Sequence, residues 1–208
     1  MDEGNRRMFD ERLQPIAGRD VAASLGPRPI AVIGARCGAE ICFATVAWAT
    51  PVSHTPPMVA FALRAKSRTF QLARESGRFS ISVPDARLAD AVNACGNKSG
   101  NTVDKSSLVE WAMEPTDGCE SSSAADPAAG QPAADRPSEA EALPVLAGAL
   151  TALSCRIGSI AEAGDHMLVT GTVERAWSRA ESDERGRIDA TDALLCVQHD
   201  LFATATIL

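Results

Sequence analysis

The feature of this sequence that most constrains its fold is that the apolar residues come in short runs, each bounded by proline, glycine or serine. Short apolar runs between turn-forming residues are typical of β-strands. Such runs are found at 28–35, 41–50, 56–63, 78–83, 149–160, 166–177 and 193–198. Because few helical segments separate them, the pattern favours a mainly β fold, a β-barrel with a few helices, over a sheet of alternating strands and helices.

The run at 166–177 shows the alternation of a half-buried antiparallel strand. One face of an extended strand would carry Met167, Val169, Val173 and Trp177, and the other Leu168, Thr170, Thr172 and Glu174.

Two helices are expected between the strands. Ser67 is placed to cap a helix through 69–76 that ends at Gly77. Asp85 is placed to cap a second helix, because Leu88, Ala91, Val92 and Cys95 then share one apolar face.

Residues 116–142 have a different composition, rich in alanine, proline, serine and acidic residues and almost free of large apolar side chains. Such a segment cannot bury enough apolar surface to order itself. We therefore expect one domain that spans 1–208 and carries this segment as a surface insertion. Within that domain, residues 1–20 are expected to form a leading polar arm or short helix. A chain of 208 residues is long enough for one sizeable core.

The charge balance limits the partners. A formal net charge of −7 argues against general nucleic-acid binding, which needs a concentrated basic surface. No apolar run approaches the roughly 20 residues that span a bilayer. Residues 1–13 are charged along their length, unlike a signal peptide. We expect a cytoplasmic protein with no membrane or nucleic-acid partner.

The usual motifs of metal, nucleotide and hydrolase sites are missing from the sequence. No glycine-rich dinucleotide or phosphate loop of the standard spacing occurs, nor a nucleophile elbow. The histidines lack ligand spacing and are expected to be structural or exposed: His54, His166 and His199. The cysteines form no metal motif and are expected to be ordinary reduced thiols: Cys37, Cys42, Cys95, Cys119, Cys155 and Cys196. No metal site is expected.

Two segments are candidates for binding an anion. Residues 66–69, Lys-Ser-Arg-Thr, stand at the expected start of a helix, where unpaired N–H groups and the helix dipole favour negative charge. The alternative is a capped, solvated helix start. The second segment, 95–105, combines glycines with Ser99 and Lys105 and could close over an anion. Its alternative is a plain polar loop.

Taken in order, four stretches of the chain resemble the flavin reductase-like family, in particular its flavoredoxin-type branch. They are 28–35 (RPIAVIGA), 44–63 (ATVAWATPVSHTPPMVAFAL), 66–105 (from KSRT through GRFSISVP to DAVNACGNKSGNTVDK) and 164–176 (GDHMLVTGTVERA). The second stretch is the most specific, with a strand entering a Pro-Val-Ser turn and a double proline before the next strand.

The resemblance implies an FMN-binding split β-barrel that forms a homodimer, with the flavin near the subunit interface. The isoalloxazine edge is then expected along Thr45, Val46, Ala47, Trp48, Thr50, Val52 and Ser53. The phosphate is expected at Lys66, Ser67, Arg68 and Thr69, beneath a closing loop that includes Ser99, Gly100 and Lys105. His166 matches a position on the flavin or nicotinamide side of the pocket and is the candidate catalytic residue.

The activity that the resemblance implies is hydride transfer from NAD(P)H to flavin, with the chemistry carried by the cofactor. Two alternatives remain open. One is an electron carrier that holds FMN tightly and receives electrons from a protein partner. The other is a flavin- or small-ligand-binding protein without turnover.

Overall fold

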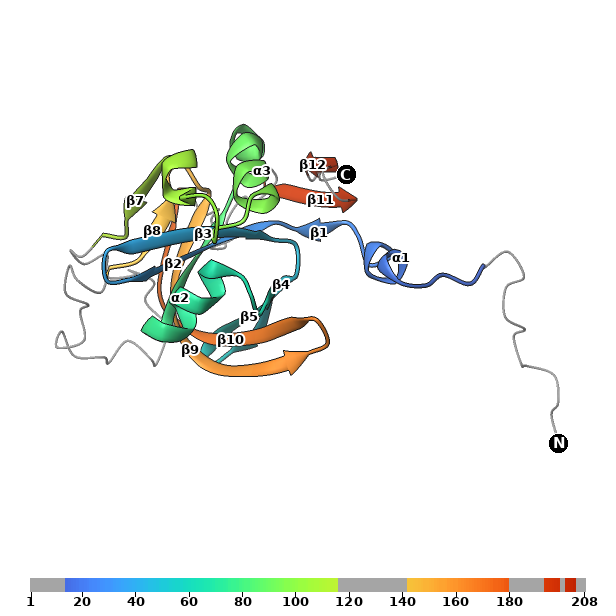
Figure 1. Ribbon diagram of the computed structural model, residues 1–208, viewed down its shortest axis with the longest axis horizontal. Coiled ribbons are helices and arrows are strands. Elements are labelled where there is room, and N and C mark those ends of the chain that lie inside the picture. Colours follow the sequence, from blue (N-terminus) through green and yellow to red (C-terminus); the bar gives the residue numbers. More distant parts are fainter. Residues whose placement is uncertain (1–13, 116–141, 180–192, 199–200, 205–208) are drawn as a thin grey trace, which may run out of the picture.

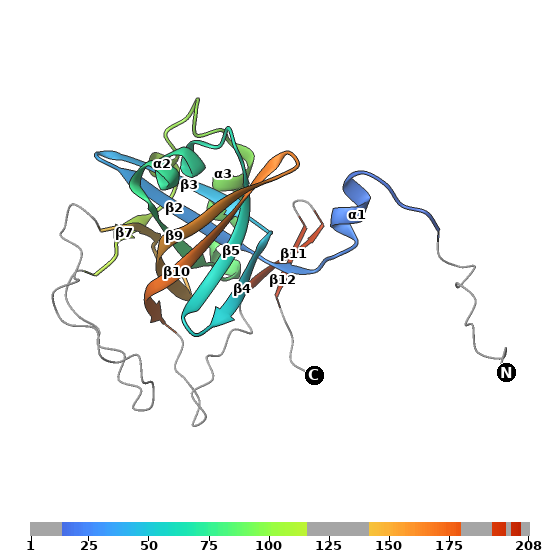
Figure 2. The ribbon, with the colours of Figure 1, turned by 90° about the horizontal axis from the view of Figure 1, so that it is seen from below.

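The structure is a computed structural model that describes residues 14–115, 142–179, 193–198 and 201–204. Its centre is a seven-stranded antiparallel sheet in the order β3-β2-β6-β9-β10-β5-β4 (Figure 1). The strands are β2 (Ala31–Cys37), β3 (Glu40–Val46), β4 (Ala49–His54), β5 (Pro57–Arg64), β6 (Arg78–Val83), β9 (Thr151–Ala163) and β10 (His166–Ser178). The sheet is strongly curved (Figure 2), and the prediction of a mainly β, barrel-like fold is confirmed.

Two smaller sheets flank the main one. β1 (Arg28–Pro29), β11 (Leu194–Gln198) and β12 (Leu201–Thr204) form one of them, in the order β1-β11-β12. β7 (Trp111–Met113) and β8 (Pro144–Leu146) form the other. The sequence predicted β11 but missed β7, β8 and β12, because three or four residues are too few to show a periodicity.

The helices follow the prediction with one change. α1 (Arg19–Ala23) is a short helix ahead of β1, and α2 (Arg68–Ser76) packs on β2 and β3 and ends at Gly77 in the left-handed conformation. Asp85 caps a 3-10 turn, η1 (Ala86–Leu88), and α3 (Ala89–Asn97) follows from that turn. A second 3-10 turn, η2 (Lys105–Leu108), lies beyond α3. Within the described part of the chain, no helix has the length and apolarity to cross a membrane.

The segment 41–54 differs from its prediction. A single strand over 41–50 and a turn at Pro51-Val52-Ser53 were expected, but β3 ends at Val46 and β4 begins at Ala49. The Pro-Val-Ser residues lie inside β4, where the register shifts between Pro51 and Ser53. β4 is an edge strand, so the N–H that Pro51 lacks costs the sheet no hydrogen bond.

The core has two parts because both faces of β2 are covered. Ile33 faces the larger apolar cluster, formed with α2, β3, β5, β6, β9 and β10, where the rings of Phe61 and Phe79 meet edge-to-face at 4.9 Å. Val32 faces the smaller cluster, under α3 and β11. In β10, Val169 is buried as predicted, but register shifts after Thr170 and after Val173 interrupt the simple alternation.

The segment predicted as an insertion lies outside the described residues, except for Ala142. That residue is buried. The two ends of the segment lie side by side: Glu114 donates its backbone N–H to the Leu143 carbonyl, and its carboxylate accepts from the Leu143 N–H at 3.0 Å. The Arg175 guanidinium adds an ion pair to the same carboxylate.

Candidate functional site

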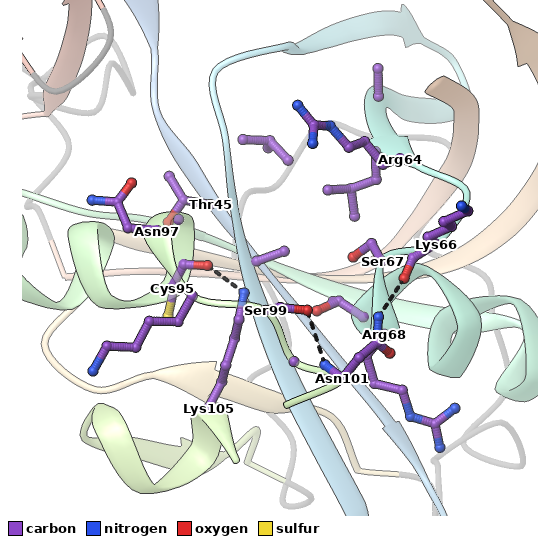
Figure 3. A pocket seen from close by; sticks show the side chains of 18 of the residues that line it. Thr45, Arg64, Lys66, Ser67, Arg68, Cys95, Asn97, Ser99, Asn101 and Lys105 are labelled. Carbon is purple, nitrogen blue, oxygen red and sulfur yellow. Dashed lines mark hydrogen bonds between the residues drawn. The ribbon is translucent and has the colours of Figure 1, made fainter. Parts of the chain in front are cut away.

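A cleft of about 700 Å³ opens where β3 passes into β4, beside the start of α2 and the end of α3 (Figure 3). Twelve of the site residues predicted from the sequence line it: Thr45, Val46, Ala47, Trp48, Lys66, Ser67, Arg68, Thr69, Ser99, Gly100, Lys105 and His166. The structure therefore brings the two candidate anion-binding segments, far apart in the chain, to one place. Three predicted residues do not line this cleft: Thr50, Val52 and Ser53, which lie farther along β4.

The elements that form the cleft are positioned by hydrogen bonds between them. The Ala62 N–H donates to the Trp48 carbonyl at 2.9 Å, which holds the break between β3 and β4 against β5. The Asn101 side chain donates to the Lys66 carbonyl at 2.9 Å, which ties the loop after α3 to the start of α2. A β-carbon at Gly100 would lie 2.5 Å from the Cys42 sulfur, so only glycine fits there.

The cleft is strongly cationic although the whole chain is acidic. Its lining includes five basic residues: Arg64, Lys66, Arg68, Lys98 and Lys105. Among the described residues that line it, none is acidic. Such a concentration of one sign of charge attracts an anionic ligand. Lys98 lies within the candidate segment 95–105 but was not named as a site residue, and Arg64 was missed because it belongs to no recognisable motif.

The start of α2 carries unsatisfied hydrogen-bonding groups. Thr69 is 1% exposed, and its hydroxyl oxygen is buried without a hydrogen-bond partner. Ser67 occupies the N-cap position with extended backbone angles, but its side chain makes no capping hydrogen bond. The positive end of a nine-residue helix thus carries two hydroxyl groups whose hydrogen-bonding capacity the helix itself does not use.

Lys105 lies deep in the cleft. The residue is 6% exposed, and its ammonium nitrogen donates to the Cys95 carbonyl at 2.5 Å. No carboxylate of the described residues forms an ion pair with it. Burial lowers the pKa of Lys105 from its usual value. A buried cation without an anionic partner is costly, so a ligand that brings a negative charge would be stabilised here.

The opposite end of the cleft is aromatic. The rings of Trp48 and His166 lie 4.7 Å apart, and the imidazole Nδ1 is 2.8 Å from the Asp165 carboxylate. The hydrogen bond with His166 lowers the pKa of Asp165. An ionised carboxylate only accepts hydrogen bonds, so Nδ1 must carry the proton, which leaves Nε2 of the neutral ring as a proton acceptor.

A second, apolar groove of about 290 Å³ adjoins the aromatic end. It shares Ala47, Trp48 and Ala62 with the cleft and is also lined by Thr50 and Leu168. Trp48 is therefore a wall common to both spaces.

No metal site accompanies these features. In the described ranges, no group of three or more histidine, cysteine or acidic residues could hold a metal ion. The five described cysteines are free thiols, and Cys119 lies outside the described residues.

Fold and site together define a class: a β-barrel protein whose cationic, partly aromatic cleft suits a phosphorylated ring compound. Residues 24–200 match the model of the flavin reductase like domain. The chain belongs to the flavin reductase-like family, as the sequence predicted. Family membership supports a flavin as the cofactor and an oxidoreductase as the class of activity.

Relatives agree with this assignment. The chain is 27% identical, over 165 residues, to the reductase subunit HsaB of a flavin-dependent monooxygenase from Mycobacterium tuberculosis, covering 74% of this chain and 73% of HsaB. Its structure is similar to that of an FMN-binding protein from Thermus thermophilus, with a TM-score of 0.73, 26% identity and coverage of 95% and 96% of the two chains. The NADH:FAD oxidoreductase SgcE6 from Streptomyces globisporus shares the fold, with a TM-score of 0.65, 22% identity and coverage of 91% and 92%.

Proposed function

We propose that this protein is an FMN-dependent oxidoreductase that transfers hydride from NAD(P)H to flavin. The observation that carries the proposal is the cleft itself, which combines five basic residues and an unpartnered threonine hydroxyl with a tryptophan–histidine pair. A ligand with an anionic tail and a flat ring complements that arrangement. The flavin, when bound, supplies the redox chemistry, since its ring accepts a hydride and passes electrons on.

The residues at the start of α2 would hold the phosphate. Ser67 and Thr69 offer hydroxyl donors, and the first N–H groups of the helix face the same end. Lys66 and Lys105 add charge-assisted hydrogen bonds. Such a set of donors is satisfied by a phosphate monoester, the group that distinguishes FMN from riboflavin.

His166 would act at the ring end of the cleft. Its Nδ1 is engaged by Asp165, which fixes the orientation of the imidazole. Its Nε2 is then free to accept a proton and return it. Trp48 lies against the imidazole and would shield the reacting groups from water.

Anaerobic absorption spectroscopy tests the proposal. Purified protein with FMN should show a perturbed flavin spectrum, and NADH or NADPH should bleach it at a rate far above that of free FMN. Bound flavin that stays oxidised with either nicotinamide would instead support an electron carrier fed by a protein partner. Absence of any flavin binding would contradict the proposal.

We further propose that the protein is a homodimer, because an apolar face lies beside the cleft. Trp48, Val52 and Leu168 are exposed large apolar residues, and Trp48 and Leu168 line the apolar groove. Clustered exposed apolar side chains are typical of a protein–protein interface. Sedimentation equilibrium should give the mass of two chains, and Leu168→Glu should shift it toward one. A monomeric wild-type protein at micromolar concentration would contradict the dimer.

A further inference from the structure

Glu40 is a carboxylate at the rim of the cationic cleft, at the start of β3. It forms a two-pronged ion pair with Arg68, the first residue of α2. The Arg68 Nε donates to Glu40 Oε1 at 2.5 Å, and its Nη2 donates to Oε2. The guanidinium and the carboxylate are thus joined by two parallel hydrogen bonds, the strong bidentate geometry for an arginine and a carboxylate.

The ion pair turns the arginine away from the site that it lines. Its remaining terminal nitrogen donates to the Gln71 side chain at 3.3 Å. The aliphatic stem of Arg68 lies beside Gly100, where an added β-carbon would come within 3.1 Å of the Arg68 Cβ. Figure 3 shows the guanidinium pointing away from Ser67 and Lys105.

A phosphate at the start of α2 would compete with Glu40 for this guanidinium. The two anions carry the same kind of acceptor oxygens, and Arg68 follows directly after the N-cap Ser67. The ion pair is partly solvated, with 29% of the Arg68 side chain and 48% of the Glu40 side chain exposed. An exposed pair of this kind is exchangeable rather than locked.

We propose that Glu40 is an internal competitor for Arg68 and thereby limits how tightly the cleft holds the phosphate of its ligand. The inference rests on the proposed function, because the ligand phosphate is that of a flavin nucleotide. Its consequence is that bound flavin exchanges with the solvent pool, as suits a protein that hands reduced flavin to another acceptor. Glu40 is a positioning residue, since it acts on the ligand through Arg68.

Titration of flavin fluorescence against Glu40→Gln protein tests the proposal without measuring turnover. The neutral amide keeps the size of the side chain but frees the guanidinium. We expect the dissociation constant for FMN to fall about threefold to fivefold, the range of an exposed ion pair. The constant for riboflavin, which lacks the phosphate, should not change.

Two controls isolate the ion pair. Glu75 is an acid of α2 that forms no ion pair with Arg68, and Glu75→Gln removes one negative charge, as Glu40→Gln does. FMN affinity should stay within about twofold in this variant, because charge at long range is screened. In an Arg68→Met background, Glu40→Gln should bring no gain, because the contested group is gone. Thermal melting checks that each variant is folded, and Glu40→Asp, with a shorter reach, serves as a second test with an intermediate gain.

The outcomes separate the inference from the function on which it rests. Unchanged or weaker FMN binding by folded Glu40→Gln protein overturns the inference while leaving the flavin site intact. An equal gain for riboflavin, or in the Arg68→Met background, also overturns it. Wild-type protein that binds neither FMN nor riboflavin overturns the proposed function and the inference together.

Discussion

The two ends of the cleft differ in chemistry, and the difference indicates what kind of molecule fits between them. The α2 end is cationic, with the Thr69 hydroxyl buried without a hydrogen-bond partner and the Lys105 ammonium buried without an anionic one. The other end presents the rings of Trp48 and His166, which are tilted by 51° to one another, and adjoins an apolar groove. One end thus favours binding of charge and the other favours a flat ring, so substitutions at the two ends should have separable effects.

The largest effect is expected at the aromatic end. His166→Ala should lower the rate of flavin reduction by about 100-fold, the lower limit for loss of a general acid–base group. The FMN dissociation constant should change little, because the phosphate donors are at the other end. Stopped-flow reduction by NADH under anaerobic conditions measures the rate. A variant that reduces flavin as fast as wild type would remove His166 from the mechanism.

Loss of the buried cation at the other end should act mainly on FMN binding rather than on the rate of flavin reduction. Lys105→Met should weaken FMN binding by roughly 30-fold, since truncating one partner of a buried charge pair costs about 2 kcal/mol or more. The ligand-free variant should nevertheless melt at a higher temperature than wild type, because the cost of burying the charge is gone. Calorimetry with and without FMN measures both effects.

The pH dependence of stability gives a further check on Lys105. Its pKa in the folded protein is lowered by burial, so the unfolded chain binds the proton more readily. Burying the charged ammonium therefore reduces the free energy of unfolding. This reduction is fully present below the folded-state pKa and is lost as the pH rises toward 10.5. The stability gap between Lys105→Met and ligand-free wild type should therefore narrow from pH 8 to about pH 10.5. A gap that widens would contradict this account.

A smaller effect is expected for the orphan hydroxyl. Thr69→Val keeps the shape of the side chain and removes a buried group without a partner. FMN affinity should fall about tenfold, the value of one hydrogen bond to a charged group, while riboflavin affinity stays constant. The unliganded protein should be as stable as wild type or more so. Equal losses for both flavins would place the phosphate elsewhere.

The smallest effect is expected for a change within the segment that the sequence predicts to be an insertion. Replacing 118–139 by a short Gly-Ser linker should alter the free energy of unfolding by less than about 1 kcal/mol, since loop-closure entropy varies slowly with length. The anchors Glu114 and Leu143 stay in place. Urea denaturation and FMN titration should both match wild type. A large loss in either would assign the segment a role that its composition does not predict.

Much of the fold could be predicted from the sequence, because local signals and tertiary structure agree. The helix that ends at Gly77 and the strand over 78–83 follow directly from a left-handed C-cap and an apolar run. The break at Ala47 and Trp48 could not be predicted, since it depends on the hydrogen bond from Ala62, fourteen or more residues away in the chain.

The site residues, too, could be predicted where the signal is local and not where it depends on tertiary contacts. Hydroxyl and basic residues at a helix start carry a local signal, as does the glycine-containing segment with Lys105, and the resemblance to a family added His166. Arg64 was missed because it joins the cleft only through the pairing of β5 with β10, which sets it opposite His166. Glu40 is a single exposed acid at a strand end, and its role depends on a partner 28 residues away.

The indole of Trp48 is a wall common to the cleft and the apolar groove, so a ligand that shifts it would couple binding in the cleft to binding over the groove. Thermodynamic reciprocity requires that any molecule bound in the cleft and any surface bound over the groove alter each other's affinity by the same factor. If a second copy of the chain covers the groove, flavin would change the dimer dissociation constant as much as dimerisation changes flavin binding. Protein concentration would then set the flavin occupancy of the protein.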